Sequence, residues 1–255
     1  MLVIDIGNTS VVMAIYKGKR LTRKKRIFPL QNENYYLKEI RNFLRQKEEF
    51  FKHISLIIIS SVVPRLNPIF KRVIKKIFRF SPIILTRKDI DIKILTLHPD
   101  KVGIDRLVNA YAVYRLYNCP AIIIDFGTAT TFDLVTEKGE YAGGIIAPGI
   151  DISRKALFEK AEQLFPASFV KTKGIIGKTT KDAMQIGIYY SVIGQVDKIV
   201  NRIQKRIGKC RIIATGGYCN LIKSKFINKT DKDLILKGLV LVGKKIREKK
   251  KIRKN

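Results

Sequence analysis

The sequence predicts an α/β fold of two related lobes, each with a mixed β-sheet, and a cleft between the lobes. An apolar run that ends in an acidic residue and a glycine turn occurs at residues 2–9 and again at residues 121–130. Antiparallel strand patterns follow each copy, and the remaining strands alternate with helices, which indicates parallel pairing with helices on the sheet faces. The two copies therefore predict two halves that bind one nucleotide from both sides.

The first half begins with a meander of strands and continues with alternating strands and helices. Turn residues separate three expected strands at 2–6, 11–16 and 21–28. Apolar residues at helical spacing predict helices at 33–51, 66–79 and 107–117. Between them we expect strands at 56–59 and 82–86, with a loop at 60–64. The first of these strands is apolar throughout, which is typical of a buried central strand.

The seam between the halves is expected at Asn118, Cys119 and Pro120, because a proline prevents the preceding helix from continuing. The predicted domains are residues 1–118 and 119–255. The second half repeats the meander and ends in helices: strands at 121–125, 130–136, 140–146 and 211–217, a glycine-rich loop at 143–149, and helices at 150–163, 180–206 and 231–247. Thr179 or Thr180 suits the N-cap of the longest helix. The basic end, residues 244–255, is expected to be a frayed, solvated tail.

The two acid–glycine turns carry the chemistry. Asp5 aligns with Asp125, and the glycines that follow are Gly7 and Gly127. A glycine has no Cβ, so backbone N–H groups and small hydroxyls there can approach a phosphate closely. The acid before the turn lies where a metal–phosphate complex needs an oxygen ligand. The alternative, a strand end followed by an ordinary turn, explains one copy better than two aligned copies.

A further acidic residue, Asp105, lies with Arg106 at or just before the first turn of a predicted helix. The helix dipole favours anions at this end. Arg106 could form a fork for a carboxylate or a phosphate. On spacing alone, an Asp helix cap beside an ordinary surface Arg explains the pair equally well.

The composition is strongly basic, with 51 Lys and Arg against 21 Asp and Glu and a formal net charge of +30. Nucleic acid, anionic membranes and phosphorylated metabolites all suit such a charge, and so does a proteome that is simply rich in lysine. The three cysteines form no Cys-x-x-Cys pair, so neither a disulfide framework nor a zinc site is supported. No apolar run approaches 18 residues and no basic leader precedes Asp5, which predicts a cytoplasmic protein without a membrane span.

Five ordered motifs together resemble the type III pantothenate kinases, a family of the acetate-kinase, sugar-kinase, Hsp70 and actin superfamily. They are Asp5-Ile6-Gly7-Asn8-Thr9, Gly103-Ile104-Asp105-Arg106, Asp125-Phe126-Gly127-Thr128-Ala129-Thr130-Thr131, Gly143-Gly144 through Pro148-Gly149, and Thr215-Gly216-Gly217. The first motif is shared by the whole superfamily, whereas the second and third in this order are specific. The resemblance covers nearly the whole chain and implies two ribonuclease H-like, actin-like lobes.

The resemblance also implies an activity, namely ATP-dependent phosphorylation of pantothenate to 4'-phosphopantothenate, the first step of coenzyme A synthesis. Asp105 would be the catalytic base for the primary hydroxyl. Substrate contacts would come from Gly103, Ile104, Asp105, Arg106 and Thr180. The ATP contacts would be Asp5, Ile6, Gly7, Asn8, Thr9, Ser10, Val11, Val12 and Thr128. Asp125 would bind a monovalent cation, K⁺ or NH₄⁺, and Mg²⁺ would accompany the nucleotide. Members are homodimers with the active site close to the interface.

The chain departs from the family pattern at one substrate contact. The family commonly has a Tyr-x-Asn-Pro sequence before the Gly-x-Asp-Arg motif, with the Tyr as the contact, and the equivalent positions here are Thr96, His98 and Pro99. This departure keeps another small-molecule kinase of the superfamily as an alternative. A second alternative is a nucleic-acid-associated accessory relative of the same fold. Its motivation is the basic hairpin at residues 17–26 and the basic tail, although no aromatic residues are interleaved with the charges of the hairpin.

Overall fold

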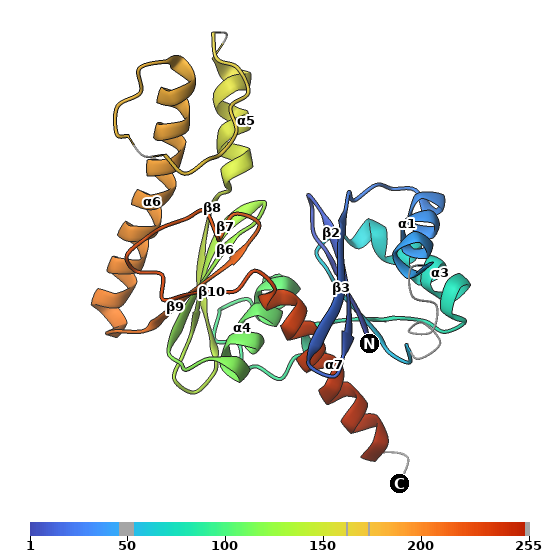
Figure 1. Cartoon of the computed structure of the whole chain (residues 1–255). Helices are drawn as coiled ribbons and strands as arrows, with labels where there is room; N and C mark the ends of the chain where they lie inside the picture. Colours follow the sequence, from blue (N-terminus) through green and yellow to red (C-terminus); the bar gives the residue numbers. More distant parts are fainter. Residues whose placement is uncertain (46–53, 162, 173, 253–255) are drawn as a thin grey trace. The chain divides into compact units, whose positions relative to one another are not determined.

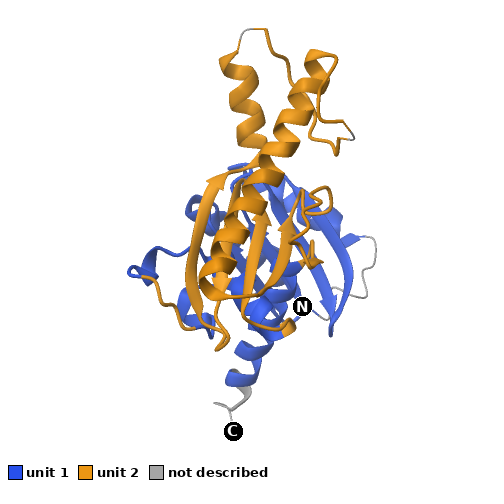
Figure 2. Cartoon of the chain, turned by 90° about the vertical axis from the view of Figure 1, so that its left-hand side faces the viewer, with its two compact units in different colours: residues 1–92, 97–115, 234–255 blue, residues 93–96, 116–233 orange. Residues whose placement is uncertain are grey.

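The computed structural model describes residues 1–45, 54–161, 163–172 and 174–252. The described chain divides into two compact units (Figure 2). Unit 1 comprises residues 1–92, 97–115 and 234–255, and unit 2 comprises residues 93–96 and 116–233. Each unit is built around one five-stranded mixed sheet. The predicted class of two α/β lobes with mixed sheets is confirmed.

The sheet of unit 1 has the order β3-β2-β1-β4-β5. Its strands are β1 (Leu2–Ile6), β2 (Val11–Lys17), β3 (Arg20–Ile27), β4 (Ile57–Ser61) and β5 (Ile83–Ile84). The first three strands form the predicted antiparallel meander, and β4 pairs parallel to both β1 and β5. The burial of every residue from Val11 to Tyr16 explains why β2 lies inside the sheet rather than at its edge.

Helices cover both faces of this sheet. On one face lie α1 (Glu33–Arg45) and α3 (Asn67–Phe78), whose apolar sides form one core with alternate residues of β1, β2 and β4. The second pair of helices is α4 (Ile104–Leu116) and α7 (Leu234–Ile252). Helix α7 packs on β1 and β4. A Cβ on Gly238 would lie 2.6 Å from the Val108 backbone oxygen, so the absence of a side chain lets α7 approach α4 closely. Helix α1 confirms the predicted helix at 33–51 as far as Arg45, and residues 46–51 of that prediction lie outside the described residues.

Unit 2 repeats the same topology. Its strands are β6 (Ala121–Phe126), β7 (Ala129–Val135), β8 (Tyr141–Pro148), β9 (Arg211–Gly216) and β10 (Lys229–Thr230), in the order β10-β9-β6-β7-β8. Reading β6 to β10 in place of β1 to β5 gives the order and strand directions of unit 1. The equivalence places Asp125 on Asp5, as the duplicated sequence pattern predicts.

Helices α5 (Ile150–Lys160) and α6 (Thr180–Ile207) belong to unit 2. The second half of α6 packs its apolar side, including Val196 and Val200, against β6 and β9. The first half of α6, together with α5 and the segment between them, forms a helical arm that extends past the sheet of unit 2 (Figures 1 and 2). Short 3₁₀ helices occur at Pro64–Leu66, Arg87–Asp89 and Pro99–Lys101.

Three local expectations are wrong. Residues 60 and 61, expected in a loop, are the last residues of β4, because they continue the parallel pairing with Asp5 and Ile6. The predicted strand at 140–146 is confirmed, but the glycine-rich loop expected to begin within it at 143 is not formed, because β8 continues to Pro148 and pairs with β7. Residues 244–252, expected to fray, continue α7, and Gly243 brings that helix against Met1 and Ile58.

The compact units differ from the predicted domains in two respects: residues 93–96 belong to unit 2, and the C-terminal helix belongs to unit 1. The predicted seam at residues 118–120 lies close to the division between residues 115 and 116, but the C-terminal helix belongs to unit 1. The reason is its packing on β1 and β4. The domain limits 1–118 and 119–255 themselves stay a prediction.

Candidate active site

In unit 1, the first acid–glycine turn closes β1 and opens β2. The Gly7 amide donates to the Ser10 carbonyl at 2.9 Å, and Arg26 of β3 donates to the Ser10 hydroxyl at 2.9 Å. A Cβ on Gly7 would lie 3.2 Å from the Ser10 carbonyl oxygen, so the turn is tight. Asn8 and Thr9 at its tip are exposed. The predicted phosphate contacts from Asp5 to Val12 therefore lie on one strand, one tight turn and the start of the next strand, and the turn presents its tip to solvent.

The second group of predicted residues in unit 1 lies in the first turn of α4, where Asp105 and Arg106 were expected. The Arg106 backbone N–H donates to Asp105 Oδ1 at 2.8 Å. A Cβ on Gly103 would lie 2.5 Å from the same oxygen, so a side chain there would push this carboxylate away from its present position at the start of the helix. Ile104 is buried and anchors the turn. The structure thus fixes the direction of Asp105 through its neighbours on both sides.

In unit 2, three glycine-bearing turns meet around the second acid. Asp125 pairs across the sheet with Thr131 of β7 and Thr215 of β9. A Cβ on Gly216, whose φ is +90°, would lie 2.5 Å from Asp125 Oδ1. A Cβ on Gly149 would overlap the Thr128 carbonyl, which lies at 2.0 Å. The turns after β6, β8 and β9 therefore approach one another as closely as backbone allows, with Asp125 and Thr128 at their meeting point.

Cys219 lies beside this cluster and is buried. Burial, and after it the nearby Asp125 carboxylate, raise the pKa of the Cys219 thiol to about 11. A thiol with such a pKa stays protonated at neutral pH and is neither a nucleophile nor a metal ligand.

The loop that carries Gly149 is tied to the β9 turn. Gly149 is the N-cap of α5, and Asp151 in the first turn of that helix accepts a hydrogen bond of 2.6 Å from the Tyr218 hydroxyl. Arg154 forms an ion pair with Asp151 at 3.4 Å. Burial, and after it the bond to Asp151, raise the pKa of Tyr218 to about 12. This neutral tyrosine therefore acts as a fixed donor that holds the two turns together.

Thr180 lies apart from that cluster, on the helical arm. It is the first residue of α6 and is exposed. Thr179 is the N-cap, and its hydroxyl accepts from the Asp182 amide at 3.1 Å. Because Thr179 makes the cap, the Thr180 hydroxyl is left for another contact. Thr96, at the position where the family has Tyr, packs near Gly143, and its hydroxyl is buried without a hydrogen-bond partner among the described residues.

Two hydroxyl residues lie beside the acids; the sequence analysis placed Ser60 in a loop and gave Thr215 only as part of the Thr215-Gly216-Gly217 motif. Ser60 pairs with Asp5 in the parallel register of β1 and β4, and Thr215 holds the same place beside Asp125. The Ser60 side chain is fully buried, and its hydroxyl has no hydrogen-bond partner in the described chain. The signal that could have found them is the repeat itself, because the strand after each crossover ends in a hydroxyl residue beside the acid.

The residues present are compatible with a nucleotide and its ions. The described residues contain no group of three or more His, Cys, Asp or Glu side chains arranged to hold a metal. Carboxylate, hydroxyl and backbone carbonyl oxygens, which Asp125, Thr128 and the adjoining turns carry, are the hard ligands that such ions prefer. Of the helices that the structure describes, none combines the length and the apolar character needed to cross a bilayer.

Solved structures share this fold. A conserved protein of Campylobacter jejuni assigned to a Baf transcriptional-activator family matches with a TM-score of 0.61 at 20% identity and covers 97% of this chain and 100% of its own. MreB 5 of Spiroplasma citri bound to AMPPNP matches with a TM-score of 0.54 at 12% identity, covering 98% of this chain and 97% of that one. At these identities the likeness shows the fold, and it confirms the expected actin-like class.

Sequence comparisons are more specific. The model of the type III pantothenate kinase family matches residues 1–202. The curated type III pantothenate kinase of Halalkalibacterium halodurans is 40% identical over 253 residues, covering 96% of this chain and 99% of the relative. That of Geotalea uraniireducens is 42% identical over 255 residues, covering 97% and 99%. With the duplicated sheet and the paired acid–glycine turns, these matches show that the chain belongs to the type III pantothenate kinase family.

Proposed function

We propose that the chain is an ATP-dependent kinase that transfers a phosphoryl group to the primary hydroxyl of pantothenate and forms 4'-phosphopantothenate, the first step of coenzyme A synthesis. Family membership over nearly the whole chain carries this proposal. The geometry supports it, since each unit presents an acid beside a tight glycine turn, and Asp105 is held at the entry of α4. The substrates are two anions, which the positive charge of the chain attracts.

The proposed roles follow from the position of each group. Residues Asp5 to Val12 hold the ATP phosphates through the amides and hydroxyls of the first turn, and Thr128 contacts the nucleotide from the second. Asp105 orients the pantothenate hydroxyl and accepts its proton late, when the bond from that oxygen to phosphorus is largely formed. Arg106 places a guanidinium where it can bind a carboxylate or phosphate, and Gly103, Ile104 and Thr180 complete the substrate contacts.

We further propose that Asp125 binds a monovalent cation, K⁺ or NH₄⁺, and that Mg²⁺ enters with ATP. These ions would supply positive charge to the phosphoryl oxygens, which is the main catalytic requirement of a loose transition state. The close approach of Gly216 to Asp125 limits the space for a larger ligand at that carboxylate. The expected cytoplasmic setting remains part of this proposal.

The direct test is a coupled assay with ATP and pantothenate, run with and without potassium, on the parent and on Asp105→Asn. The substitution keeps the size of the side chain but removes its capacity to take a proton. We expect turnover to be lost while ATP still binds in an equilibrium titration. A variant that keeps most of its turnover would overturn the assignment of Asp105 as the base. A panel of other small alcohols with labelled ATP separates pantothenate from alternative substrates.

We propose that the protein is a homodimer that pairs through the helical arm of unit 2. Several large apolar side chains of the arm are exposed, among them Ile175 at 68% and Ile176 at 82%. An apolar surface of this kind marks an interaction site. We expect Ile175→Asp with Ile176→Asp to give a monomer in light scattering, whereas Leu97→Asp in unit 1, where the side chain is 94% exposed, leaves the dimer intact.

The nucleic-acid alternative has less support. The basic strand β3 uses its cations within unit 1, since Lys25 pairs with Glu39 at 2.7 Å, Arg26 donates to Ser10, and the Arg23 guanidinium lies 5.1 Å from the centre of the Phe43 ring. These contacts support the interpretation of the hairpin as a structural element rather than a binding ribbon.

A further inference from the structure

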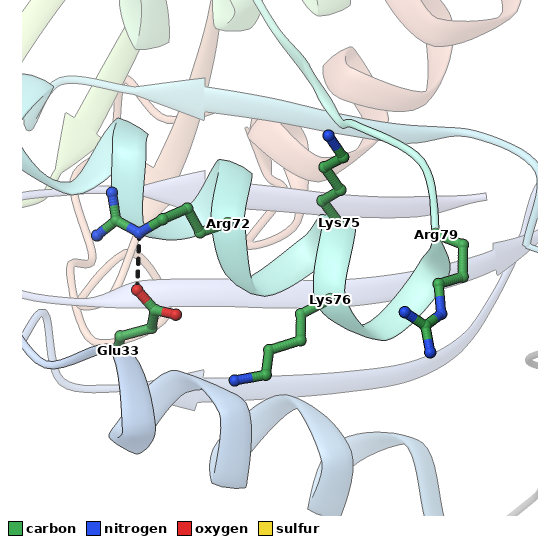
Figure 3. Close-up of a pocket in the computed structure, with 5 residues that line it drawn as sticks. All are labelled: Glu33, Arg72, Lys75, Lys76 and Arg79. Carbon is green, nitrogen blue, oxygen red and sulfur yellow. Dashed lines mark hydrogen bonds and ion pairs between the residues drawn. The ribbon is translucent and has the colours of Figure 1, made fainter.

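A basic hollow of about 360 Å³ lies on the outer side of the helical layer of unit 1. Its lining consists of one acidic residue of α1 and four cations of α3 and its C-cap: Glu33, Arg72, Lys75, Lys76 and Arg79 (Figure 3). The proposed kinase activity assigns no role to any of them. We propose that this hollow binds a small anion that carries two or more phosphate groups.

The spacing of the cations gives the site its form. Arg72, Lys76 and Arg79 follow one another at i, i+4 and i+7, so they lie along one face of α3. Seven residues of α-helix span about 10 Å, which is longer than one phosphate group. Lys76 extends toward α1, while Lys75 lines the hollow from the other side of the helix (Figure 3). The stripe therefore suits an anion with several charges in a row.

Among the described residues, the charges of the stripe are largely unneutralised. Arg72 donates to Glu33 Oε2 at 2.8 Å. Within residues 1–45, 54–161, 163–172 and 174–252, Lys75, Lys76 and Arg79 have no acidic partner. Segment 67–79 contains no acidic residue at all. Elsewhere on the surface, cations such as Lys25 and Lys155 are paired with glutamates. Cations also suit a helix C-terminus, but that accounts for residues in the last turn and not for Arg72 or the hollow.

The chemistry of the lining favours phosphate over other anions. A guanidinium offers a planar fork that binds two phosphate oxygens at once, and an ammonium adds a mobile point charge. With Arg72 and Arg79 at the two ends of the stripe and Lys76 between them, forks at both ends match an anion with phosphates at both ends. The Glu33 carboxylate holds Arg72 in place, and it also repels the ligand.

The hollow is separate from the phosphate turn of the same unit. The parallel strands β1 and β4 end on the same side of the sheet, the side on which the Asp5 turn lies, and α3 then leads back to the start of β5. Because β5 runs parallel to β4, it starts at the opposite ends of the strands. The last turn of α3, with Lys75, Lys76 and Arg79, therefore lies toward those opposite ends. An anion bound there does not occupy the proposed ATP site.

The size of the hollow argues against nucleic acid as its ligand. Single DNA-binding modules bury about 600–1,000 Å² of protein surface. A stripe of about 10 Å on one helix offers contacts to only a few phosphates. Nucleic acid is therefore an outcome that the experiment must distinguish from the proposed small anion.

The test is a titration of the ¹⁵N-labelled full chain with inorganic triphosphate, without magnesium and at fixed ionic strength. The backbone amides of residues 72–79 report the hollow, and those of residues 7–10 report the phosphate turn separately, so a failure of one site does not affect the other. We expect saturable shifts at residues 72–79, with inorganic phosphate at least about fivefold weaker than triphosphate, because fewer charge-assisted bonds form.

Four variants make the test specific to the hollow. Lys76→Glu with Arg79→Glu should weaken triphosphate binding at residues 72–79 at least about tenfold, because two charge-assisted contacts are lost. Lys205→Glu with Arg206→Glu reverses the same number of exposed charges in the last turn of α6. This control pair should change the affinity for triphosphate at residues 72–79 less than about twofold. Glu33→Gln removes the repelling charge and should strengthen triphosphate binding at residues 72–79 about two- to fivefold. The neutral pair Lys76→Gln with Arg79→Gln should weaken binding as well, and it covers the case in which the reversed pair does not fold.

Three results overturn the proposal. The first is the absence of shifts at residues 72–79 at millimolar triphosphate. The second is an equal loss in the α6 control pair, which would show that only the overall charge matters. The third is a 12-nucleotide single-stranded DNA that binds at these residues more tightly than triphosphate, which would assign the hollow to nucleic acid instead.

Discussion

Gly216→Ala tests whether the three turns of unit 2 must approach one another as closely as the structure shows. Gly216 has a φ of +90°, and a Cβ there would lie 2.5 Å from Asp125 Oδ1 and 2.6 Å from the backbone of Phe126. A side chain in this conformation costs about 1–2 kcal/mol. Displacing packed neighbours costs about 1–3 kcal/mol more. The expected loss in the free energy of unfolding is therefore about 2–5 kcal/mol.

Gly217→Ala is the matched control, because a Cβ at the next residue would meet nothing within 4 Å. The smaller entropy of the unfolded chain should offset any cost, so its stability should lie within about 1 kcal/mol of the parent. Urea unfolding followed by circular dichroism compares the two. With a slope of about 2–3 kcal/mol per molar urea, Gly216→Ala should lower the midpoint by about 1–2 M.

The activity of the same two variants tests the role of the turn. Gly216→Ala pushes against the Asp125 carboxylate, so the potassium needed for half-maximal rate should rise, whereas Gly217→Ala should leave it unchanged. Equal midpoints for the two alanine variants would refute the close approach on which this reasoning rests. A destabilised Gly216→Ala with unchanged potassium dependence would leave the geometry standing and remove Asp125 as the cation ligand.

Three further predictions follow from single contacts. Ser60→Ala should raise the stability of the ligand-free protein by about 1 kcal/mol, because it removes a buried hydroxyl without a partner among the described residues. A loss of stability would contradict this expectation. A lower kcat/KM for ATP in the same variant would show that the nucleotide contacts the Ser60 hydroxyl. Tyr218→Phe should weaken the hold on Asp151. Since the pKa of Tyr218 is raised to about 12, the parent keeps this contribution below its unfolded pKa of about 10 and loses it as pH rises through about 12, so the two proteins should converge in stability across that window when unfolding is measured at each pH. Thr179→Ala should lower stability by about 1 kcal/mol through loss of the cap to Asp182, and an unchanged urea midpoint would show that the cap contributes nothing.

The local patterns that the sequence predicted correctly are those set by short-range chemistry. The apolar run before Asp5, the helical spacing after Arg106 and the cap at Thr179 each have their cause within a few residues. The duplication of the acid–glycine turn also predicted the repeated sheet, because strands of the same pattern before the same turn have the same pairing options.

The features that could not be predicted depend on residues far apart in the chain. The sequence predicted the strand at 140–146, but the glycines from residue 143 onward also suggested a loop, and only the row of partners that β7 offers extends β8 to Pro148. Ser60 belongs to β4 only because β1 extends the ladder to that point. The basic end of α7 remains helical beyond Lys244 because the helix is already docked on β1 and β4. The sequence likewise does not predict the close approach of the Gly149 and Thr128 backbones or the hydrogen bond from Tyr218 to Asp151. Each of these contacts joins segments that are far apart in the chain and share no sequence pattern.

The docking of α7 has a consequence for how the protein is made. Met1 and Ile58 contact the helix near Gly243, so unit 1 cannot complete the covering of its sheet until α7 has left the ribosome. Unit 2, by contrast, is contiguous apart from residues 93–96 and has all its strands once Thr230 has emerged. The half that is translated first is therefore finished last, and the nascent chain must keep β1 and β4 exposed on one face during most of synthesis.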